Sequence, residues 1–120
     1  MASDSPSELR ELRDLVRAFV AERDWDKFHT PKNLAVSLSV EAGELLEPFQ
    51  WVAAGSTDEL TDAQLVQVRH EAADVLIYLI RLADKLGIEL GGAVREKLEL
   101  NKQKYPAGLV KGSARKYTEY

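Results

Sequence analysis

Apolar residues recur every three or four positions in four segments of the chain, which is the spacing of one face of an α-helix. In the first segment, Ser5 and Pro6 provide a capped helix start, and the apolar positions then run to about Trp25. In the second segment, Thr30 and Pro31 provide the N-cap and the first helical residue. These two starts predict two separate helices in the N-terminal half.

The second helix is expected to end near residues 53–56. A polar stretch at about 57–61 begins the third and longest helix, which Gly87 ends. A fourth and more polar helix is predicted over 89–106, where Pro106 terminates it. No alternation typical of strands and no repeat interrupts this pattern.

The pattern therefore predicts an all-α protein with the architecture of a four-helix bundle. A chain of 120 residues is expected to form one domain over 1–120, with tails at 1–6 and about 107–120. Without cysteine there is no disulfide or thiolate chemistry, and no stretch has the apolar length of a membrane span. We expect a cytoplasmic protein without membrane contact. Its net charge of −4 argues against nucleic acid as a partner.

Two acidic pairs lie at the edge of the apolar face of their helices. At about 100° per residue, Glu44 lies about 60° from Glu41 around the second helix. Glu71 and Asp74 have the same relation on the third helix, with Tyr78 between them around the helix axis. If the two helices pack together, four carboxylates converge on a small volume.

Converging carboxylates repel one another unless they are protonated or neutralised by a cation. Oxygen ligands of this kind favour a hard divalent ion, which predicts Mg²⁺, with Mn²⁺ as the alternative. The competing interpretation is that each pair is a solvated helix surface. A di-iron site is disfavoured because none of the four acids is followed three residues later by histidine.

Several motifs in order along the chain resemble one protein family. They are "ERDWDKFHTPKNL", "EAGELLEPFQW", "EAADVLIYL", "LNKQKYP" and "GSARKYTEY". Together they resemble the MazG-like all-α nucleoside triphosphate pyrophosphohydrolases, and within them the dCTP pyrophosphatase branch. The resemblance implies Mg²⁺-dependent cleavage of a nucleoside triphosphate to the monophosphate and pyrophosphate, in a homotetramer built from dimers with sites between chains.

Residue roles follow from the same resemblance. The metal ligands would be Glu41, Glu44, Glu71 and Asp74. Either Glu41 or Glu44 is expected to accept the proton of the attacking water. Glu47 is a candidate ligand of lower rank, and Pro48 directly after it is expected to kink the helix beside the metal site.

The resemblance also implies a set of substrate-binding residues. Trp25 and Trp51 would stack on the base, although composition alone equally allows two aromatics that close the ends of a bundle. His29 would hydrogen-bond the nucleotide or brace its turn, and Tyr78 would position the sugar or a metal ligand.

A basic cluster near the C-terminal end is the last candidate. Lys102 and Lys104, with Asn101 and Tyr105, would contact phosphate or sugar, or the lysines would simply be solvated.

A second apolar face supports the expectation of an oligomer. It comprises Val36, Val40, Ile77 and Ile80, on the side of their helices opposite the core arc. For function, the family resemblance implies dCTP or a modified dCTP as substrate. Two alternatives stay open: the same reaction on dUTP or an oxidised nucleotide, and a nonenzymatic helical oligomer.

Overall fold

The computed structural model describes residues 7–114 and 117–119, and within these residues all regular structure is helical. The chain divides into two compact units, Met1–Ile88 and Glu89–Tyr120, which are described separately below. None of the described helices is long and apolar enough to cross a membrane. The predicted all-α class is therefore confirmed, whereas the single domain stays a prediction.

Helix α1 spans Glu8–Glu22 and begins at Ser7, whose side chain accepts a hydrogen bond of 3.2 Å from the backbone N–H of Arg10. The start predicted at Ser5 and Pro6 lies outside the described residues. A serine at this position satisfies one of the free N–H groups of the first turn, which explains why the helix begins here.

Helix α2 spans Pro31–Leu46 and follows the short 3-10 helix η2, Asp26–Phe28. The predicted start is confirmed, because the Thr30 side chain accepts a hydrogen bond of 3.1 Å from the N–H of Asn33. The predicted end near residues 53–56 is wrong.

Pro48 explains the early end of α2. It has no N–H to donate to the Glu44 carbonyl, so the α-helix stops at Leu46 and the chain tightens into the 3-10 helix η3, Glu47–Phe49. The kink expected at Pro48 is thus a helix end.

Helix α3 spans Asp62–Lys85 and begins with a reciprocal capping box. The Thr61 hydroxyl accepts from the N–H of Gln64 at 3.1 Å, and the Gln64 side chain accepts from the N–H of Thr61 at 2.9 Å. Gly87, with φ of +67°, follows its C-cap, as predicted.

The loop between α2 and α3 is held by one carboxylate. It contains the 3-10 helix η4, Thr57–Glu59, and the Glu59 side chain accepts hydrogen bonds of 2.8, 3.0 and 3.1 Å from three consecutive backbone N–H groups, those of Ala53, Ala54 and Gly55. These bonds to an anionic acceptor lower the pKa of Glu59. The loop therefore has a defined conformation that fixes the antiparallel return of the chain.

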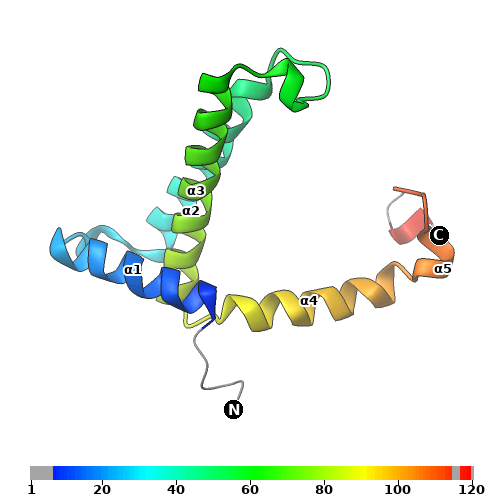
Figure 1. Cartoon of the computed structure of the whole chain (residues 1–120). Helices are drawn as coiled ribbons and strands as arrows, with labels where there is room; N and C mark the ends of the chain where they lie inside the picture. Colours follow the sequence, from blue (N-terminus) through cyan, green and yellow to red (C-terminus); the bar gives the residue numbers. More distant parts are fainter. Residues whose placement is uncertain (1–6, 115–116, 120) are drawn as a thin grey trace. The chain divides into compact units, whose positions relative to one another are not determined.

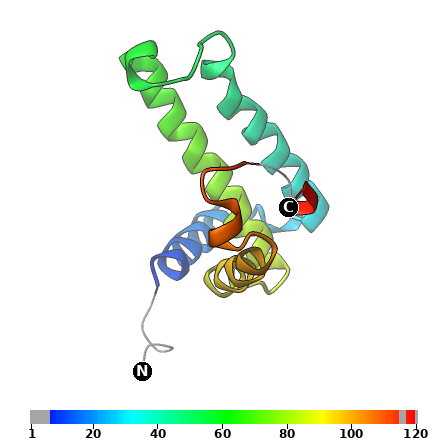
Figure 2. The same ribbon diagram turned by 90° about the vertical axis from the view of Figure 1, so that its right-hand side faces the viewer.

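Helices α2 and α3 lie side by side and antiparallel, and α1 packs across the end of α3 opposite this loop (Figures 1 and 2). The buried apolar side chains on the helices of this unit include, among the described residues, Val20, Leu34, Ile80 and Ala83. This small core joins all three helices and positions the functional faces of α2 and α3.

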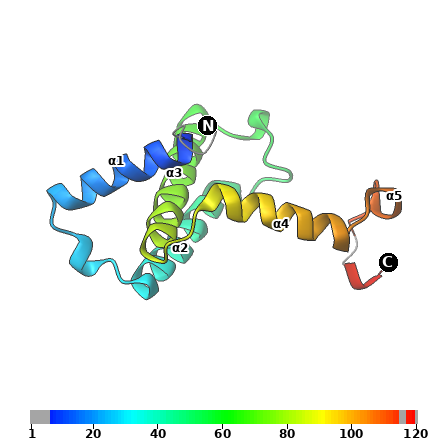
Figure 3. The ribbon, with the colours of Figure 1, turned by 90° about the horizontal axis from the view of Figure 1, so that it is seen from below.

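The second unit contains α4, Leu90–Lys104, which runs as one continuous helix into a turn and the short helix α5, Ala107–Val110 (Figure 3). The Glu89 side chain caps α4 by accepting from the N–H of Gly92 at 2.6 Å. A 3-10 helix, η5, covers Tyr117–Glu119. The described residues thus hold five α-helices rather than the predicted four, because Pro106 ends α4 and also begins another turn of helix.

Much apolar surface remains uncovered in this single chain. Exposed side chains on α2 and α3 include Val36 at 54%, Val40 at 55% and Ile77 at 42%. Ile80 was expected on the same outer face, but only 4% of its surface is exposed, so packing within the chain already covers it. Three of the four residues that were predicted to face a partner subunit are therefore exposed in the single chain.

Replacing Thr61 by alanine is expected to lower the free energy of unfolding by about 1 kcal/mol, because the first turn of α3 loses its cap. Thr57 is the matched control: it is exposed four residues earlier, and its side chain makes no hydrogen bond with the other described residues. Chemical denaturation should show less than about 0.5 kcal/mol for Thr57→Ala. Equal losses in the two variants would contradict the capping role.

Candidate active site

Three carboxylates meet where α2 packs against α3. One oxygen each from Glu41, Glu44 and Glu71 lies within 4.8 Å of the other two, and all three side chains are half-buried. Glu41 and Glu44 are one helical turn apart on α2, and Glu71 faces them from α3. The predicted convergence of acids from the two helices is thus present for three of the four residues.

The electrostatic cost of this arrangement is concentrated on Glu41. Burial raises the pKa of its carboxyl group to about 7, and the neighbouring carboxyl groups of Glu44 and Glu71 and the charge of Asp74 act in the same direction. One oxygen of Glu41 and one of Glu71 are buried without a hydrogen-bonding partner among the described residues. Unpartnered buried oxygens of like charge require a proton or a cation.

Asp74 and Glu47 lie at the margin of the cluster. The charge of Asp74 is close enough to affect the pKa of Glu41, but Asp74 is not one of the three acids within 4.8 Å of one another. Glu47 is exposed on η3, beyond the end of α2. A ligand role for either residue stays a prediction.

The cluster fits a hard divalent ion. Its donors are all carboxylate oxygens, and the two orphaned oxygens belong to different helices, so that one cation between them would satisfy both. Mg²⁺ and Mn²⁺ both prefer such donors. The arrangement therefore supports a metal centre between α2 and α3.

A small pocket lies in the same unit, between α1, the η2 segment and α3. It has a volume of about 70 Å³, and three of the predicted substrate-binding residues line it: Trp25, His29 and Tyr78. Its other walls are apolar except for Arg81. Trp25 packs edge-to-face against Phe19, with ring centroids 5.6 Å apart. The pocket offers flat apolar surface with a few polar groups, as a base site requires.

Helix α3 connects the acid cluster to this pocket. Glu71, Asp74, Tyr78 and Arg81 follow one another at intervals of three, four and three residues, which places them on one face of the helix. At 1.5 Å per residue this row extends over about 15 Å. A single extended ligand lying along α3 can therefore reach both the acids and the pocket.

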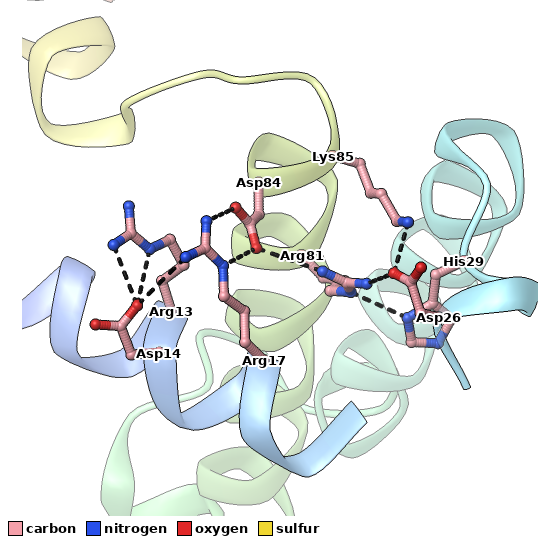
Figure 4. Close-up of polar contacts among 8 residues, drawn as sticks. All are labelled: Arg13, Asp14, Arg17, Asp26, His29, Arg81, Asp84 and Lys85. Atoms are coloured by element: carbon pink, nitrogen blue, oxygen red, sulfur yellow. Dashed lines mark hydrogen bonds and ion pairs between the residues drawn. The ribbon is translucent and has the colours of Figure 1, made fainter. Parts of the chain in front are cut away.

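A network of charged side chains extends from two residues that line the pocket, His29 and Arg81 (Figure 4). Arg81 contacts Asp26 and His29 on the η2 segment and Asp84 on its own helix, and Lys85 pairs with Asp26 at 2.6 Å. Sequence reasoning missed this network. The one available signal was an arginine within the apolar run of α3, on the face that carries the acids.

Trp51 does not join this pocket within one subunit. It follows η3, at the opposite end of α2 from Trp25, and α2 alone is about 24 Å long. Its side chain is 92% exposed. The two tryptophans of one chain therefore cannot hold the same base.

The remaining predicted residues belong to the second unit. Asn101 and Lys104 lie in the last turn of α4, and Tyr105 is its C-cap. Asn101 is half-buried, and Lys104 and Tyr105 are exposed. Their roles toward a nucleotide stay predictions.

Comparison with known proteins identifies the family to which this chain belongs. The MazG-like family profile matches residues 36–120, and the chain belongs to this family. It is similar to dCTP pyrophosphatase 1 from Homo sapiens (42% identity over 113 residues) and from Mus musculus (43% over 115 residues). Each match covers 92% of this chain but 66% of the relative, so the chain spans about two thirds of the length of these proteins.

A solved structure supports the same family assignment. The fold is similar to the crystal structure of a pyrophosphatase from Archaeoglobus fulgidus, with a TM-score of 0.77 and 46% identity, over 85% of this chain and 95% of that one. The MazG-like resemblance found in the sequence motifs is therefore confirmed.

Without divalent ions, the stability of the protein is expected to fall as the pH rises. The folded-state pKa of Glu41, about 7, exceeds its ordinary value of 4.5, so the contribution of this group is complete below about pH 4.5 and is lost as the pH passes 7. The melting temperature in EDTA should drop by a few degrees between about pH 5 and about pH 8, and Mg²⁺ should restore it.

Glu41→Gln should flatten this pH dependence and weaken the response to Mg²⁺. Glu11→Gln, at an exposed position on α1, is the control and should change neither. An unaltered pH profile in Glu41→Gln would show that another group is responsible.

Proposed function

We propose that the protein hydrolyses dCTP, or a modified dCTP, to the monophosphate and pyrophosphate with Mg²⁺ as cofactor, and so removes unwanted nucleotides from the precursor pool. The observation that carries this proposal is the cluster of Glu41, Glu44 and Glu71, with its two orphaned carboxylate oxygens, in a chain of the MazG-like family. The names of the similar proteins support pyrophosphate release and point to dCTP.

The four acids Glu41, Glu44, Glu71 and Asp74 would hold the ion. Bound Mg²⁺ neutralises phosphate charge and lowers the pKa of water. Glu41 is the first candidate to accept the proton of the attacking water, through a carboxylate oxygen that does not ligate the ion. Glu44 is the second candidate for this role, and Mn²⁺ is the alternative ion.

The nucleotide would lie along α3 with its phosphates at the acids. Its base would enter the pocket lined by Trp25, His29 and Tyr78. Asn101, Lys104 and Tyr105 belong to the second unit, and a role in binding phosphate or sugar is proposed for them from their residue types alone. Phosphate binding suits the basic character of the last turn of this helix, which also contains Lys102.

A homotetramer assembled from dimers would complete the site. Trp51 is 92% exposed and lies far from the pocket of its own chain, so a stacking role for it requires a neighbouring subunit. The exposed Val36, Val40 and Ile77 give that neighbour an apolar face to cover. We assign the assembly to the cytoplasm and expect no membrane or nucleic-acid partner.

The main alternative is the same reaction on another base, such as dUTP or an oxidised nucleotide, because aromatic stacking does not select a base. A helical oligomer without activity is the other alternative. The retention of three acids in one cluster, at an electrostatic cost, favours the enzyme.

Purified protein is expected to release pyrophosphate from dCTP only when Mg²⁺ is present, and faster than from the other common deoxynucleotides. Glu41→Gln and Asp74→Asn should each lower activity by more than about 100-fold, because loss of a ligand costs more than loss of a supporting contact. The control is Glu11→Gln, an exposed position on α1, a helix that carries none of the predicted site residues. If no common or oxidised deoxynucleotide is cleaved, the enzyme proposal is wrong.

A mixture of two impaired variants tests the shared site. Glu41→Gln removes a metal ligand and Trp51→Ala removes a stacking surface, so each protein alone should be poorly active at low dCTP. If the two residues act from different subunits, random mixing restores about a quarter of the sites. Co-refolded protein should recover that share of activity, whereas no recovery would mean that both residues serve the same chain's site.

A further inference from the structure

Arg81 is a buried charge within an apolar stretch of α3. Only 7% of its surface is exposed, and its guanidinium group is surrounded by three side chains (Figure 4). It donates to Asp26, to Asp84 at 3.3 Å and, through Nε, to Nδ1 of His29 at 3.2 Å. A buried cation needs such partners. The three partners differ in whether another side chain also pairs with them.

Two of the three partners do not depend on Arg81 for their neutralisation. Asp26 also pairs with Lys85 at 2.6 Å, and Asp84 accepts a hydrogen bond of 2.7 Å from Arg17. His29 is different, because within residues 7–114 and 117–119 the guanidinium of Arg81 is its only side-chain hydrogen-bonding partner. The contact that only Arg81 supplies is therefore the one to the imidazole.

The chemistry of the guanidinium fixes the proton on that ring. Arginine has five N–H donors and no acceptor, so Nδ1 of His29 must be the acceptor of the hydrogen bond from Nε. In a neutral imidazole the other nitrogen, Nε2, then carries the proton. The ring is thus a hydrogen-bond donor at its free nitrogen.

The charges around His29 keep the ring neutral. Burial lowers the pKa of His29, and the positive charge of Arg81 and, more weakly, that of Lys85 act in the same direction. Asp26 is the charged group that opposes them. Protonation of Nδ1 would also place an N–H against the guanidinium, so the geometry and the charges favour the same state.

We propose that Arg81 is a positioning residue that holds His29 as the neutral Nε2–H tautomer beside Trp25 and Tyr78. His29 lines the pocket together with these two aromatic residues, so the ring donates a hydrogen bond to an acceptor atom on the edge of the nucleobase. Cytosine carries such acceptors at O2 and N3. The inference rests on the proposed function for the identity of the ligand, and on the contacts of Arg81 for the state of the ring.

The state of the ring can be measured without turnover. The chain has two histidines, so a His70→Gln background leaves His29 as the only imidazole in a long-range nitrogen–proton NMR spectrum. We expect one acceptor-type and one N–H-type nitrogen. In Arg81→Met the two nitrogen shifts should move toward each other and the pKa of His29 should rise, because the hydrogen bond and the positive charge are both lost.

Two further variants separate the effect of Arg81 on His29 from general effects on the charged network and on folding. Arg17→Met removes a guanidinium of the same network that does not touch His29, and it should leave both shifts unchanged. Arg81→Lys retains the charge for Asp26 and Asp84 but lacks the Nε–H donor, so it should alter the shifts even if Arg81→Met fails to fold. Unchanged shifts in the folded Arg81 variant would overturn the proposal.

Ligand binding tests whether His29 donates a hydrogen bond to the base. Calorimetric titration with dCMP should show an affinity about tenfold weaker in Arg81→Met and unchanged in Arg17→Met. For dCTP hydrolysis, KM should rise by a similar factor with kcat nearly constant, which is the pattern of lost uniform binding. A fall in kcat alone, or equal effects in both variants, would overturn it.

The two proposals fail in different ways. If the protein cleaves no nucleotide but shows the fixed tautomer and Arg81-dependent dCMP binding, the proposed hydrolysis is wrong and the positioning role of Arg81 is supported. A protein that cleaves dCTP with an unaltered KM in Arg81→Met would support the hydrolase and overturn the role of Arg81.

Discussion

Repulsion between the carboxylates of Glu41, Glu44 and Glu71 opposes the packing of α2 against α3, and the rest of the first unit has to outweigh it. The buried residues that offset the repulsion are few, with Leu34 the largest that is completely enclosed. The loop held by Glu59 and the cap at Thr61 define where the two helices can meet. A cation between the acids would turn the opposing force into an attraction, so the stability of this unit and the proposed function would depend on the same contact.

The helix starts that the sequence predicted correctly are those with a local chemical signal. Thr30 with Pro31, and the polar residues before α3, satisfy free N–H groups within their own turn, so no distant contact is needed to recognise them. The convergence of acids was predictable for a related reason, since helical geometry alone places Glu41, Glu44 and Glu71 at the edges of apolar faces that must pack.

Features that depend on distant parts of the chain were not predictable in the same way. Arg81 meets residues more than 50 positions away, and nothing in its immediate sequence identifies Asp26 or His29 as partners. The end of α2 was misplaced because the apolar periodicity continues past Pro48, although the backbone cannot. The positions of the two tryptophans follow from where α2 ends, and periodicity does not reveal that they lie too far apart to share a base.

The early end of α2 has a consequence for the metal centre. Glu44 lies in the last turn of the helix, and its own backbone carbonyl accepts a hydrogen bond from the N–H of Glu47, the C-cap residue. The aligned peptide dipoles give this end of the helix a partial negative charge of roughly half an electron. The helix itself thus adds to the negative potential at the acids. A cation held by these acids would act as an electrostatic C-cap for α2, because it would offset the negative end of the helix dipole as well as the charge of the side chains.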